Sequence, residues 1–349
     1  ITLVPMDTSC SVKALGKAFW RWLRGDIGEI TCDQPYRYTN LVSLTFFNLW
    51  CLRLGSGMKA DVIHSHDLSP LPAAWLIARL RGMRLVYDAH ESAPDFYSGR
   101  KGKLAGWLEK RLIGKPQAVI TVGERLARAL RDRGARKVVV IGNWKPLKIY
   151  RVEDWQFEQE RQRLGLDNQR LVIAYFGLLH PERDIEPLLQ AVTAHPEVTL
   201  LISGEGVLKE RVMAAAAKTP NIRWLGWLKI DEIGFYTAIA DVVYYSINSE
   251  YSGQANYSTP NKLFEAFAAG KAMIARRGVG EIGEILERTG AGWLLDEITP
   301  ESLQAAFQKL EDPETLKALQ ECAEAARKIY NWNEAEARLL ALYGELLDE

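Results

Sequence analysis

Cysteine is scarce in this chain and forms no paired motif. The 349 residues include only four cysteines, at positions 10, 32, 51 and 322, with no CxxC pair. This spacing argues against a disulfide framework and a cysteine-based zinc site, and it indicates reduced thiols. No run of about 18 uncharged apolar residues occurs, so we expect no membrane-spanning helix. No signal peptide is visible, and these absences together favour a cytoplasmic protein.

The chain also lacks net charge, but its two parts differ sharply. It has 44 basic and 44 acidic residues. Residues 1–150 hold 24 Lys and Arg against 12 Asp and Glu, whereas residues 151–349 hold 20 against 32. An excess of this size indicates that the first part meets something anionic: membrane lipid, a lipid-phosphate acceptor or nucleic acid. The alternative is that the positive charge of the first part is balanced by the negative charge of the second part when the two domains pack together.

Residues 11–24 predict a basic amphipathic helix. Val12, Leu15, Phe19, Trp22 and Leu23 fall on one face, and Lys13, Lys17, Arg21 and Arg24 fall on the other. Such a helix with tryptophans can lie in a membrane interface. It can equally pack on the protein's own core with a solvated basic face.

From residue 60 onward, short apolar β-branched runs alternate with helical patterns. Strand-like runs occupy residues 60–67, 84–91, 118–123, 137–143, 171–177, 198–204, 222–227, 241–247, 272–277 and 292–296. This alternation predicts parallel sheets covered by helices, and residues 143–146 break it as an interdomain linker would. We therefore expect an α/β fold of two doubly wound Rossmann-like domains, residues 1–146 and 147–330. They should face each other across a cleft, with ligands at the carboxyl ends of the strands.

The stretch YSTPNKLFEAFAAG, residues 257–270, predicts a helix whose start can hold an anion. Thr259 is a good N-cap, and Pro260 then falls at the first helical position. A helix start offers unpaired N–H groups and partial positive charge, which suit a phosphate. Lys262 and Glu265 lie three residues apart on one face, where they could contact a phosphate and sugar hydroxyls. The alternative is a capped core helix with a surface ion pair.

This segment resembles the nucleotide-sugar loop of retaining glycosyltransferases of family 4, in the subgroup that reads PNKLFE. The runs before it, residues 241–247, and after it, residues 271–286, follow the same order. The resemblance implies the GT-B architecture, in which a C-terminal helix, here residues 331–349, returns to the first domain. The resemblance covers the chain from about residue 60 and fails before it, where the family's first strand and glycine-rich turn are missing. We therefore expect a first domain that is incomplete at its N-terminus.

The resemblance also implies which residues bind the donor. In these enzymes the amides at the helix start hold the distal phosphate, and the glutamate binds the ribose. The residues so implied are Ser258, Thr259, Asn261, Leu263 and Glu265. Tyr257 replaces a glutamate that many members carry, which leaves open how the donor sugar's hydroxyls are held.

A second donor segment, residues 176–192, resembles the family's phosphate-binding segment. Gly177 permits close backbone approach, and Arg183 stands where the family often binds the pyrophosphate, a task that suits a guanidinium fork. Leu178 replaces a second arginine, and Lys262 is expected to compensate. Trp227 belongs to a segment that resembles the one whose main chain reads the base.

Three histidines lie at predicted strand ends in the first domain: His64, His66 and His90. The His-x-His pair puts two imidazoles on one side of a strand, as in some metal-dependent hydrolases. Further ligands are missing from the pattern and no Asp-x-Asp pair occurs, so we expect no metal. His90 resembles the family's active-site histidine. His66, Asp67 and Glu91 are expected on the acceptor side.

The resemblance implies a retaining glycosyltransferase of the hexosyltransferase type, and the residues above supply the charges that such a reaction needs. It would move a sugar from a nucleotide diphosphate sugar to an acceptor hydroxyl, in bacterial-type cell-surface polysaccharide or glycolipid assembly. Arg183, Lys262 and the amides near Asn261 would stabilise the growing phosphate charge without a metal or cofactor. His90 would orient and stabilise the attacking state.

The expected partners are the nucleotide sugar, a sugar or lipid-linked acceptor, and an anionic membrane surface that meets the basic first domain, but not nucleic acid. This would place a cytoplasmic enzyme at the inner face of the membrane. Two other functions stay open: a GT-B epimerase or phosphorylase, and a non-catalytic nucleotide-sugar-binding subunit.

Overall fold

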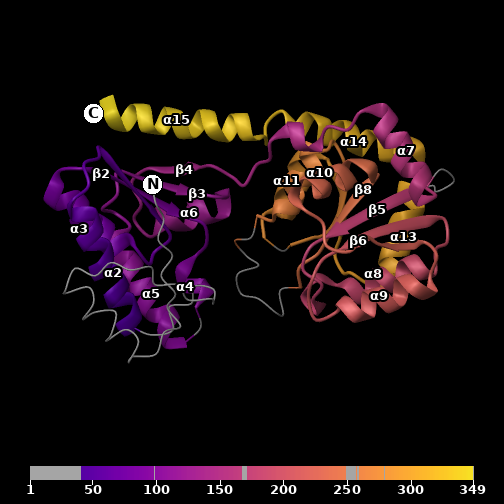
Figure 1. The fold of residues 1–349 in the computed structure, drawn as a ribbon, viewed down its shortest axis with the longest axis horizontal. Coiled ribbons are helices and arrows are strands. Elements are labelled where there is room, and N and C mark those ends of the chain that lie inside the picture. Colours follow the sequence, from indigo (N-terminus) through magenta and orange to yellow (C-terminus); the bar gives the residue numbers. More distant parts are fainter. Residues whose placement is uncertain are drawn as a thin grey trace.

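The structure is a computed structural model that describes residues 41–97, 99–166, 171–248, 257, 259–278 and 280–348. Two α/β units lie side by side along its long axis, and helix α15 (Trp332–Asp348) extends from the second unit over the first (Figure 1). The predicted helix at residues 11–24 and the expected incompleteness of the first domain both concern residues outside these ranges. None of the helices in the described ranges combines the length and apolar character needed to cross a membrane.

The first unit is built on a four-stranded parallel sheet in the order β1-β2-β3-β4. Its strands are β1 (Val62–His66), β2 (Arg84–Ala89), β3 (Ala118–Thr121) and β4 (Val138–Val140). The helices are α2 (Leu41–Ser56), α3 (Leu71–Arg81), α4 (Ala93–Phe96), α5 (Gly99–Leu112) and α6 (Glu124–Asp132). Because the strands follow chain order, right-handed crossovers place the connecting helices on one face.

Apolar side chains alternate between the two faces of this sheet. Leu85 and Tyr87 pack with residues of α3, α5 and α6 on one face. Val86, between them, points the other way with Ala118 and Ile120, against Leu342 and Leu346 of α15. The period of two in the strand therefore explains why α15 is needed to cover the second face.

The second unit has a six-stranded parallel sheet in the order β10-β9-β8-β5-β6-β7. Its strands are β5 (Leu171–Phe176), β6 (Val198–Ser203), β7 (Ile222–Trp224), β8 (Val242–Tyr245), β9 (Ala272–Arg276) and β10 (Gly292–Leu295). The order reverses between β5 and β8, which makes this the topological switch point where such sheets bind ligands.

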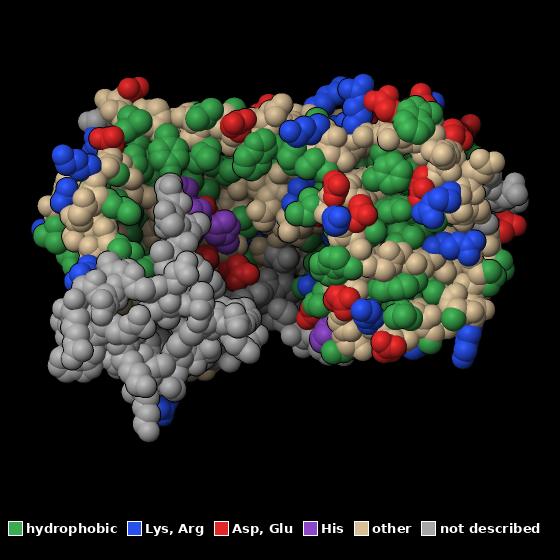
Figure 2. Space-filling view, viewed as in Figure 1, with side chains coloured by type: hydrophobic (Ala, Val, Ile, Leu, Met, Phe, Trp, Pro, Cys, Tyr) green, Lys and Arg blue, Asp and Glu red, His purple; other side chains and the backbone are tan. Residues whose placement is uncertain are grey.

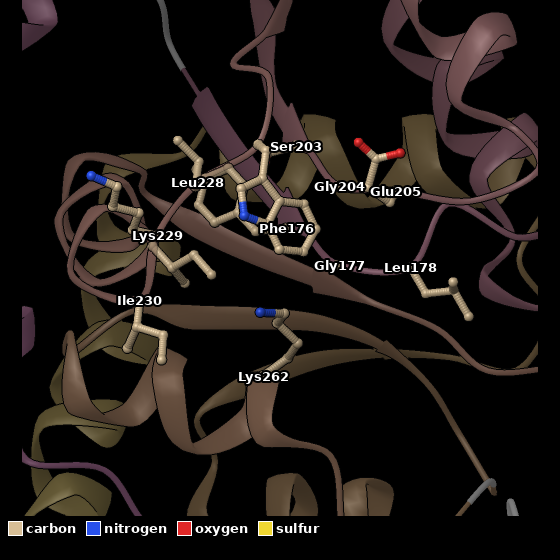
Figure 3. Close-up of a pocket in the computed structure, with 12 residues that line it drawn as sticks. Phe176, Gly177, Leu178, Ser203, Gly204, Glu205, Leu228, Lys229, Ile230 and Lys262 are labelled. Atoms are coloured by element: carbon tan, nitrogen blue, oxygen red, sulfur yellow. The ribbon is translucent and has the colours of Figure 1, made fainter. Parts of the chain in front are cut away.

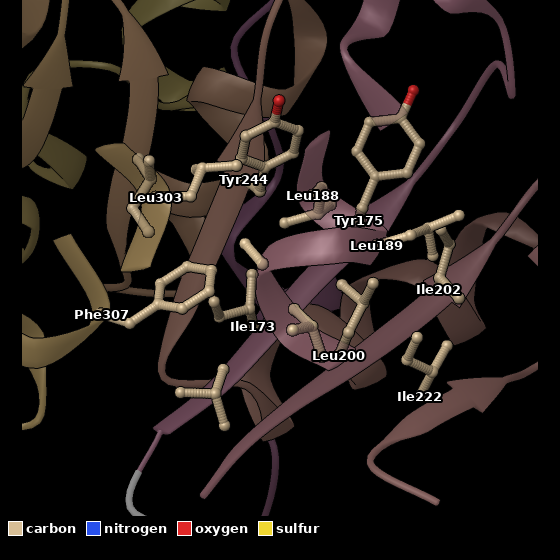
Figure 4. Packing of buried hydrophobic residues seen from close by; sticks show 14 of the residues in the cluster. Ile173, Tyr175, Leu188, Leu189, Leu200, Ile202, Ile222, Tyr244, Leu303 and Phe307 are labelled. Atoms are coloured by element: carbon tan, nitrogen blue, oxygen red, sulfur yellow. The ribbon is translucent and has the colours of Figure 1, made fainter. Parts of the chain in front are cut away.

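Helices cover both faces of this second sheet. They are α7 (Asp154–Leu164), α8 (Ile185–Thr193), α9 (Lys209–Lys218), α10 (Ile230–Ile239), α11 (Asn261–Ala268), α12 (Ile282–Thr289), α13 (Pro300–Leu310) and α14 (Pro313–Arg327), with 3-10 turns η1 (Leu147–Tyr150) and η2 (Pro181–Arg183). On one face, strand residues such as Ile173 and Leu200 pack with Leu188 of α8 and Phe307 of α13 (Figure 4). The prediction of two parallel α/β domains is confirmed.

The two domains touch where β3 meets α6. The Arg125 backbone N–H donates to the Glu281 carboxylate, and the Arg125 Nε lies 2.9 Å from Glu284 Oε1. The Thr259 hydroxyl donates to the Val122 carbonyl at 3.5 Å. The residues just before α11 and α12 therefore fix the second domain against the first.

Candidate active site

A cavity of about 440 Å³ opens at the carboxyl ends of β5, β6 and β7 (Figure 3). Its lining residues are Phe176, Gly177, Leu178, Ser203, Gly204, Glu205, Trp227, Leu228, Lys229, Ile230, Ile233 and Lys262. The volume is typical of small-molecule sites, and the position adjoins the switch point. Three predicted donor residues, Gly177, Trp227 and Lys262, therefore meet in one cavity.

Glycines let the loops after β5 and β6 approach each other closely. Gly204 has φ +150°, and a Cβ there would collide with the carbonyl of Gly177. Gly206 has φ +148°, and a Cβ there would collide with the backbone of Leu179. A Cβ at Gly177 would instead lie 3.6 Å from Lys262 Cε, an ordinary contact. The ISGEG turn at residues 202–206 is thus a structural requirement of the cavity wall, although such a short glycine turn is a weak sequence signal.

Helix α11 begins at Asn261, one residue later than the sequence predicted. Its N-cap is Pro260, which has extended backbone (φ −68°, ψ 140°) and no capping side chain. The prediction that Thr259 caps the helix is wrong, because its hydroxyl bonds to Val122 of the first domain instead. The helix start is nevertheless next to the cavity, since Lys262 reaches into it (Figure 3).

A compact polar cluster surrounds this helix start. Lys262 Nζ lies 2.6 Å from Glu265 Oε2, and both side chains are largely buried. Lys145 Nζ, from the interdomain linker, donates to Asn261 Oδ1 at 2.8 Å. Burial lowers the pKa of Lys145, while Glu265 raises it and Lys262 lowers it. Sequence reasoning missed Lys145, because its only signal was a lysine in the segment that breaks the strand–helix rhythm.

Arg183 lies at the switch point rather than in the cavity wall. Its Nη1 donates to the Tyr245 hydroxyl at 2.8 Å, and its Nη2 lies 3.3 Å from Glu182 Oε1. The guanidinium also stacks over the Tyr245 ring, 5.4 Å from its centroid. Tyr245 ends β8, so the strand beside β5 holds the arginine. The sequence indicated no role for this tyrosine.

Leu263, another predicted donor residue, does not face the cavity, and the neighbouring Tyr257 and Ser258 complete this segment. The Leu263 side chain is fully buried in the core, and its N–H donates to the Pro260 carbonyl at 3.1 Å. Ser258 lies outside the described residues. Tyr257, which replaces the family's glutamate, packs against the core of the first domain. In this chain Tyr257 therefore contributes to the contact between the domains.

The acceptor-side histidines gather around one carboxylate that sequence reasoning missed. Asp88 Oδ2 lies 3.2 Å from His64 Nε2, 3.1 Å from His66 Nδ1 and 3.3 Å from His90 Nε2. His66 Nδ1 is also 3.2 Å from His90 Nε2. The parallel register pairs His66 with Asp88, which explains the convergence. Figure 2 shows histidine side chains of the first domain beside the hollow between the domains.

The other predicted acceptor-side residues lie around this cluster. Asp67 has a positive φ of 62°, and its N–H donates to the Asp88 carbonyl at 2.8 Å. Burial raises the pKa of Glu91, and the charge of Asp67 adds to this. The C-terminal helix contributes as well, since the Tyr343 hydroxyl lies 2.6 Å from His64 Nδ1.

Asp88 sets the charge state of its neighbours. Burial would raise the pKa of Asp88, but hydrogen bonds and charge from His64 and His90 outweigh it and hold the pKa well below its usual range. The hydrogen bond to Asp88 raises the pKa of His90, against partial burial. Burial and His64 lower the pKa of His66. Asp88 thus favours the protonated form of His90, whereas burial and the neighbouring histidines favour the neutral form of His66.

His64, His66 and Asp88 could also share a metal ion, because one ligand atom from each lies within 4.8 Å of the other two. Asp88 is the further ligand that the sequence pattern did not supply. The same atoms satisfy one another by hydrogen bonding, with Asp88 accepting from the imidazoles. The arrangement therefore requires no ion to hold it together.

Two family models match the chain. The glycosyl transferase 4-like domain matches residues 18–144, and the glycosyl transferases group 1 domain matches residues 156–329. The chain belongs to this glycosyltransferase family. The resemblance that began with the PNKLFE segment is thus confirmed over both domains, and the expectation that it fails before residue 60 is wrong, because the first match begins at residue 18.

Curated relatives agree with this family. The chain is 28% identical over 308 residues to the D-inositol 3-phosphate glycosyltransferase of Segniliparus rotundus, covering 82% of this chain and 66% of that protein. It is 23% identical over 316 residues to the alpha-monoglucosyldiacylglycerol synthase of Acholeplasma laidlawii, covering 84% and 77%. The match thus spans just under two thirds of the first of these relatives.

Solved structures show the same two-domain fold. The sucrose-phosphate synthase of Thermosynechococcus elongatus superposes with a TM-score of 0.72 at 18% identity, covering 92% of this chain and 82% of that one. Anabaena HepE in complex with UDP-glucose gives a TM-score of 0.68 at 20% identity, covering 94% and 89%. The predicted GT-B architecture is confirmed.

Proposed function

We propose that this glycosyltransferase moves a sugar from a nucleotide diphosphate sugar to an acceptor hydroxyl and retains the anomeric configuration. The observation that carries the proposal is the cavity at the ends of β5 to β7, with Lys262 and the start of α11 at its edge. HepE, which shares the fold, was solved with UDP and with UDP-glucose. A nucleoside diphosphate is accordingly the ligand that we infer for this cavity.

The nucleoside would occupy the apolar part of the cavity. Trp227 is 70% exposed there, so its ring is available to a base, and Glu265 would accept from ribose hydroxyls. The diphosphate would lie at the first amides of α11, close to Lys262. A bound phosphate would compete with Glu265 for the Lys262 ammonium. Arg183, held by Tyr245, would supply a second cation from the switch point.

The chemistry follows from these charges. The bond from the anomeric carbon to the diphosphate oxygen breaks, and the acceptor oxygen bonds the same face of that carbon. The acceptor proton passes to the departing phosphate. Lys262, Arg183 and the α11 amides stabilise the growing negative charge where it forms. Asp88 raises the pKa of His90 and orients its ring, which favours donation by His90 to the donor sugar or its leaving oxygen.

No metal takes part in this proposal, because cationic side chains and helix amides supply the charge. The acceptor would be a sugar or a lipid-linked molecule in polysaccharide or glycolipid assembly, at the inner face of a membrane. The relatives named for an inositol phosphate and a diacylglycerol support an acceptor of this kind. The basic first part of the chain agrees with an anionic acceptor or surface.

Incubation with a panel of nucleotide sugars tests the proposal. With an acceptor, a retaining transferase releases the nucleoside diphosphate. Without an acceptor, it hydrolyses the nucleotide sugar slowly, and proton NMR should show that the first sugar released has the same anomeric configuration as the donor. An epimerase would instead convert the nucleotide sugar without any acceptor, and a phosphorylase would need inorganic phosphate. Binding without turnover would identify a non-catalytic subunit. Initial release of the opposite anomer would contradict retention.

A further inference from the structure

Helix α5 carries a surface that the transfer chemistry does not use. Six residues recur three or four positions apart along it and so share one side. We call them the α5 face: Arg100, Lys103, Leu104, Trp107, Lys110 and Arg111. All six are exposed, including 57% of Trp107 and 40% of Leu104. The Arg111 guanidinium stacks on the Trp107 ring, 5.7 Å from its centroid.

The charge on this face has a single sign. The only acid in α5 is Glu109, which is fully buried on the opposite side. Its carboxylate accepts from Arg133 Nη1 at 2.7 Å and from the Tyr87 hydroxyl at 3.5 Å. Within the described part of the chain, none of the four cations of the α5 face forms an ion pair. The apolar Trp107 and Leu104 are therefore ringed by uncompensated positive charge.

The inner side of α5 is firmly held. Ala105 and Leu112 belong to the core of the first domain. Arg133 binds not only Glu109 but also Asp95 of α4, at 3.1 Å. The helix lies on the face of the sheet opposite α15, away from the contacts between the domains (Figure 1). Its outer face is thus presented on a rigid support.

We propose that the α5 face docks the protein on a bilayer that contains anionic phospholipid. Trp107 and Leu104 would enter the boundary between headgroups and acyl chains, while the four cations contact lipid phosphates. Charge complementarity alone would also suit nucleic acid. The bilayer is favoured because an exposed tryptophan and leucine at the centre of the face gain from an apolar phase. This inference rests on the membrane location in the proposed function and names the surface that would make the contact, and vesicle binding tests it separately from sugar transfer.

Docking would also orient the acceptor side of the enzyme. The chain passes from His90 through α4 directly into α5, and Arg133 ties the two helices together. A membrane bound at the α5 face would therefore hold the domain that carries the acceptor-side histidines. The histidines of the first domain would then face lipid-linked acceptors in a fixed orientation.

Co-sedimentation with vesicles tests this inference. The full chain should bind phosphatidylcholine–phosphatidylglycerol vesicles at low salt, bind phosphatidylcholine vesicles weakly, and dissociate as salt rises. The double variant Lys103→Glu, Lys110→Glu should lower the partition coefficient by about tenfold or more, since each cation near an anionic surface contributes roughly fivefold. Trp107→Ala should also weaken binding to the mixed vesicles.

A matched control reverses two exposed lysines of the second domain, Lys218→Glu and Lys309→Glu, and should bind like the wild type. All variants should bind the nucleoside diphosphate as tightly as the wild type does, which shows that they fold. Because this binding is measured apart from vesicle binding, failure of the membrane inference can be told from failure of the proposed function. Two results would overturn the inference: unchanged vesicle binding by the α5 variants, or no binding by the wild type at low salt. Tighter binding to duplex DNA than to the vesicles, unaffected by Trp107→Ala, would also overturn it.

Discussion

Single side chains carry the proposed chemistry at two places, the donor cavity and the histidine cluster. At the donor side, the predicted cation Arg183 is held by two partners, Tyr245 and Glu182. A guanidinium fixed in advance loses little freedom when it binds phosphate oxygens. This preorganisation is the reason to expect a large effect from a single substitution.

Arg183→Ala should lower kcat/KM by tenfold or more, towards the roughly 100- to 1000-fold typical of losing one such donor. The reason is that the departing diphosphate loses a fixed cation. Steady-state kinetics with the best nucleotide sugar measures the effect, and a thermal melt confirms folding. Arg211→Ala is the matched control, because Arg211 is exposed and its ion pair among the described residues is with the half-exposed Glu186. Wild-type kinetics in Arg183→Ala would remove this residue from the mechanism.

At the histidine cluster, Asp88→Asn should lower the pKa of His90, since the hydrogen bond that raises it would be lost. Because the pKa of His90 is higher in the folded than in the unfolded protein, the His90–Asp88 pair stabilises the fold. This stabilisation is complete below the unfolded-state pKa of about 6.5, and it is lost as the pH rises through the folded-state pKa. The variant should therefore lose most stability in mildly acidic buffer. NMR titration of the histidine ring protons checks this, and an unchanged His90 midpoint would count against the role given to Asp88.

Local sequence patterns pointed to residues of the donor cavity, but not to the partners of the histidines in the first domain. Gly177, Lys262 and Glu265 follow from a strand end and a helix start, which are encoded within a few residues. Asp88 and Tyr343 do not, because their partners depend on sheet register and on a helix that returns about 280 positions later. A carboxylate near the end of the buried strand β2 was the available signal for Asp88.

At the scale of elements, α15 decides whether the first sheet has a covered second face. Leu342 is 2% exposed and packs on Val86 and Ile120, whereas Leu340 on the same helix is 65% exposed. The strand–helix alternation predicted the sheet, and only the family resemblance predicted this returning helix. The start of α11 was misplaced by one residue, because the first domain binds the Thr259 hydroxyl that was expected to cap it.

Leu342→Ala should destabilise the protein by about 2–5 kcal/mol, the usual range for emptying a leucine site in a core. Leu340→Ala should change the free energy of unfolding by less than about 0.5 kcal/mol, as exposed sites do. Urea unfolding of both variants gives the comparison. Similar changes in the free energy of unfolding for the two variants would show that α15 does not pack on the first domain as described.

At the scale of the whole molecule, two sheets are joined by one linker and by α15, and the linker itself reaches the donor site through Lys145 and Asn261. The contacts of Val122 and Arg125 with the second domain lie near the start of α11. We therefore expect donor binding and the relative position of the domains to be coupled through the same few residues. Closure of the two domains around the donor would exclude water, which otherwise competes with the acceptor.

The central claim is that a nucleoside diphosphate binds at the start of α11 without a metal. Calorimetric titration in EDTA with uridine, guanosine, adenosine and thymidine diphosphates tests it most directly, with Lys262→Ala beside the wild type and Lys218→Ala as the exposed-lysine control. The account predicts that one diphosphate binds clearly more tightly than the others, and that only Lys262→Ala weakens it, by about tenfold or more. No binding of any diphosphate in EDTA, or equal binding by the Lys262→Ala variant, would contradict it.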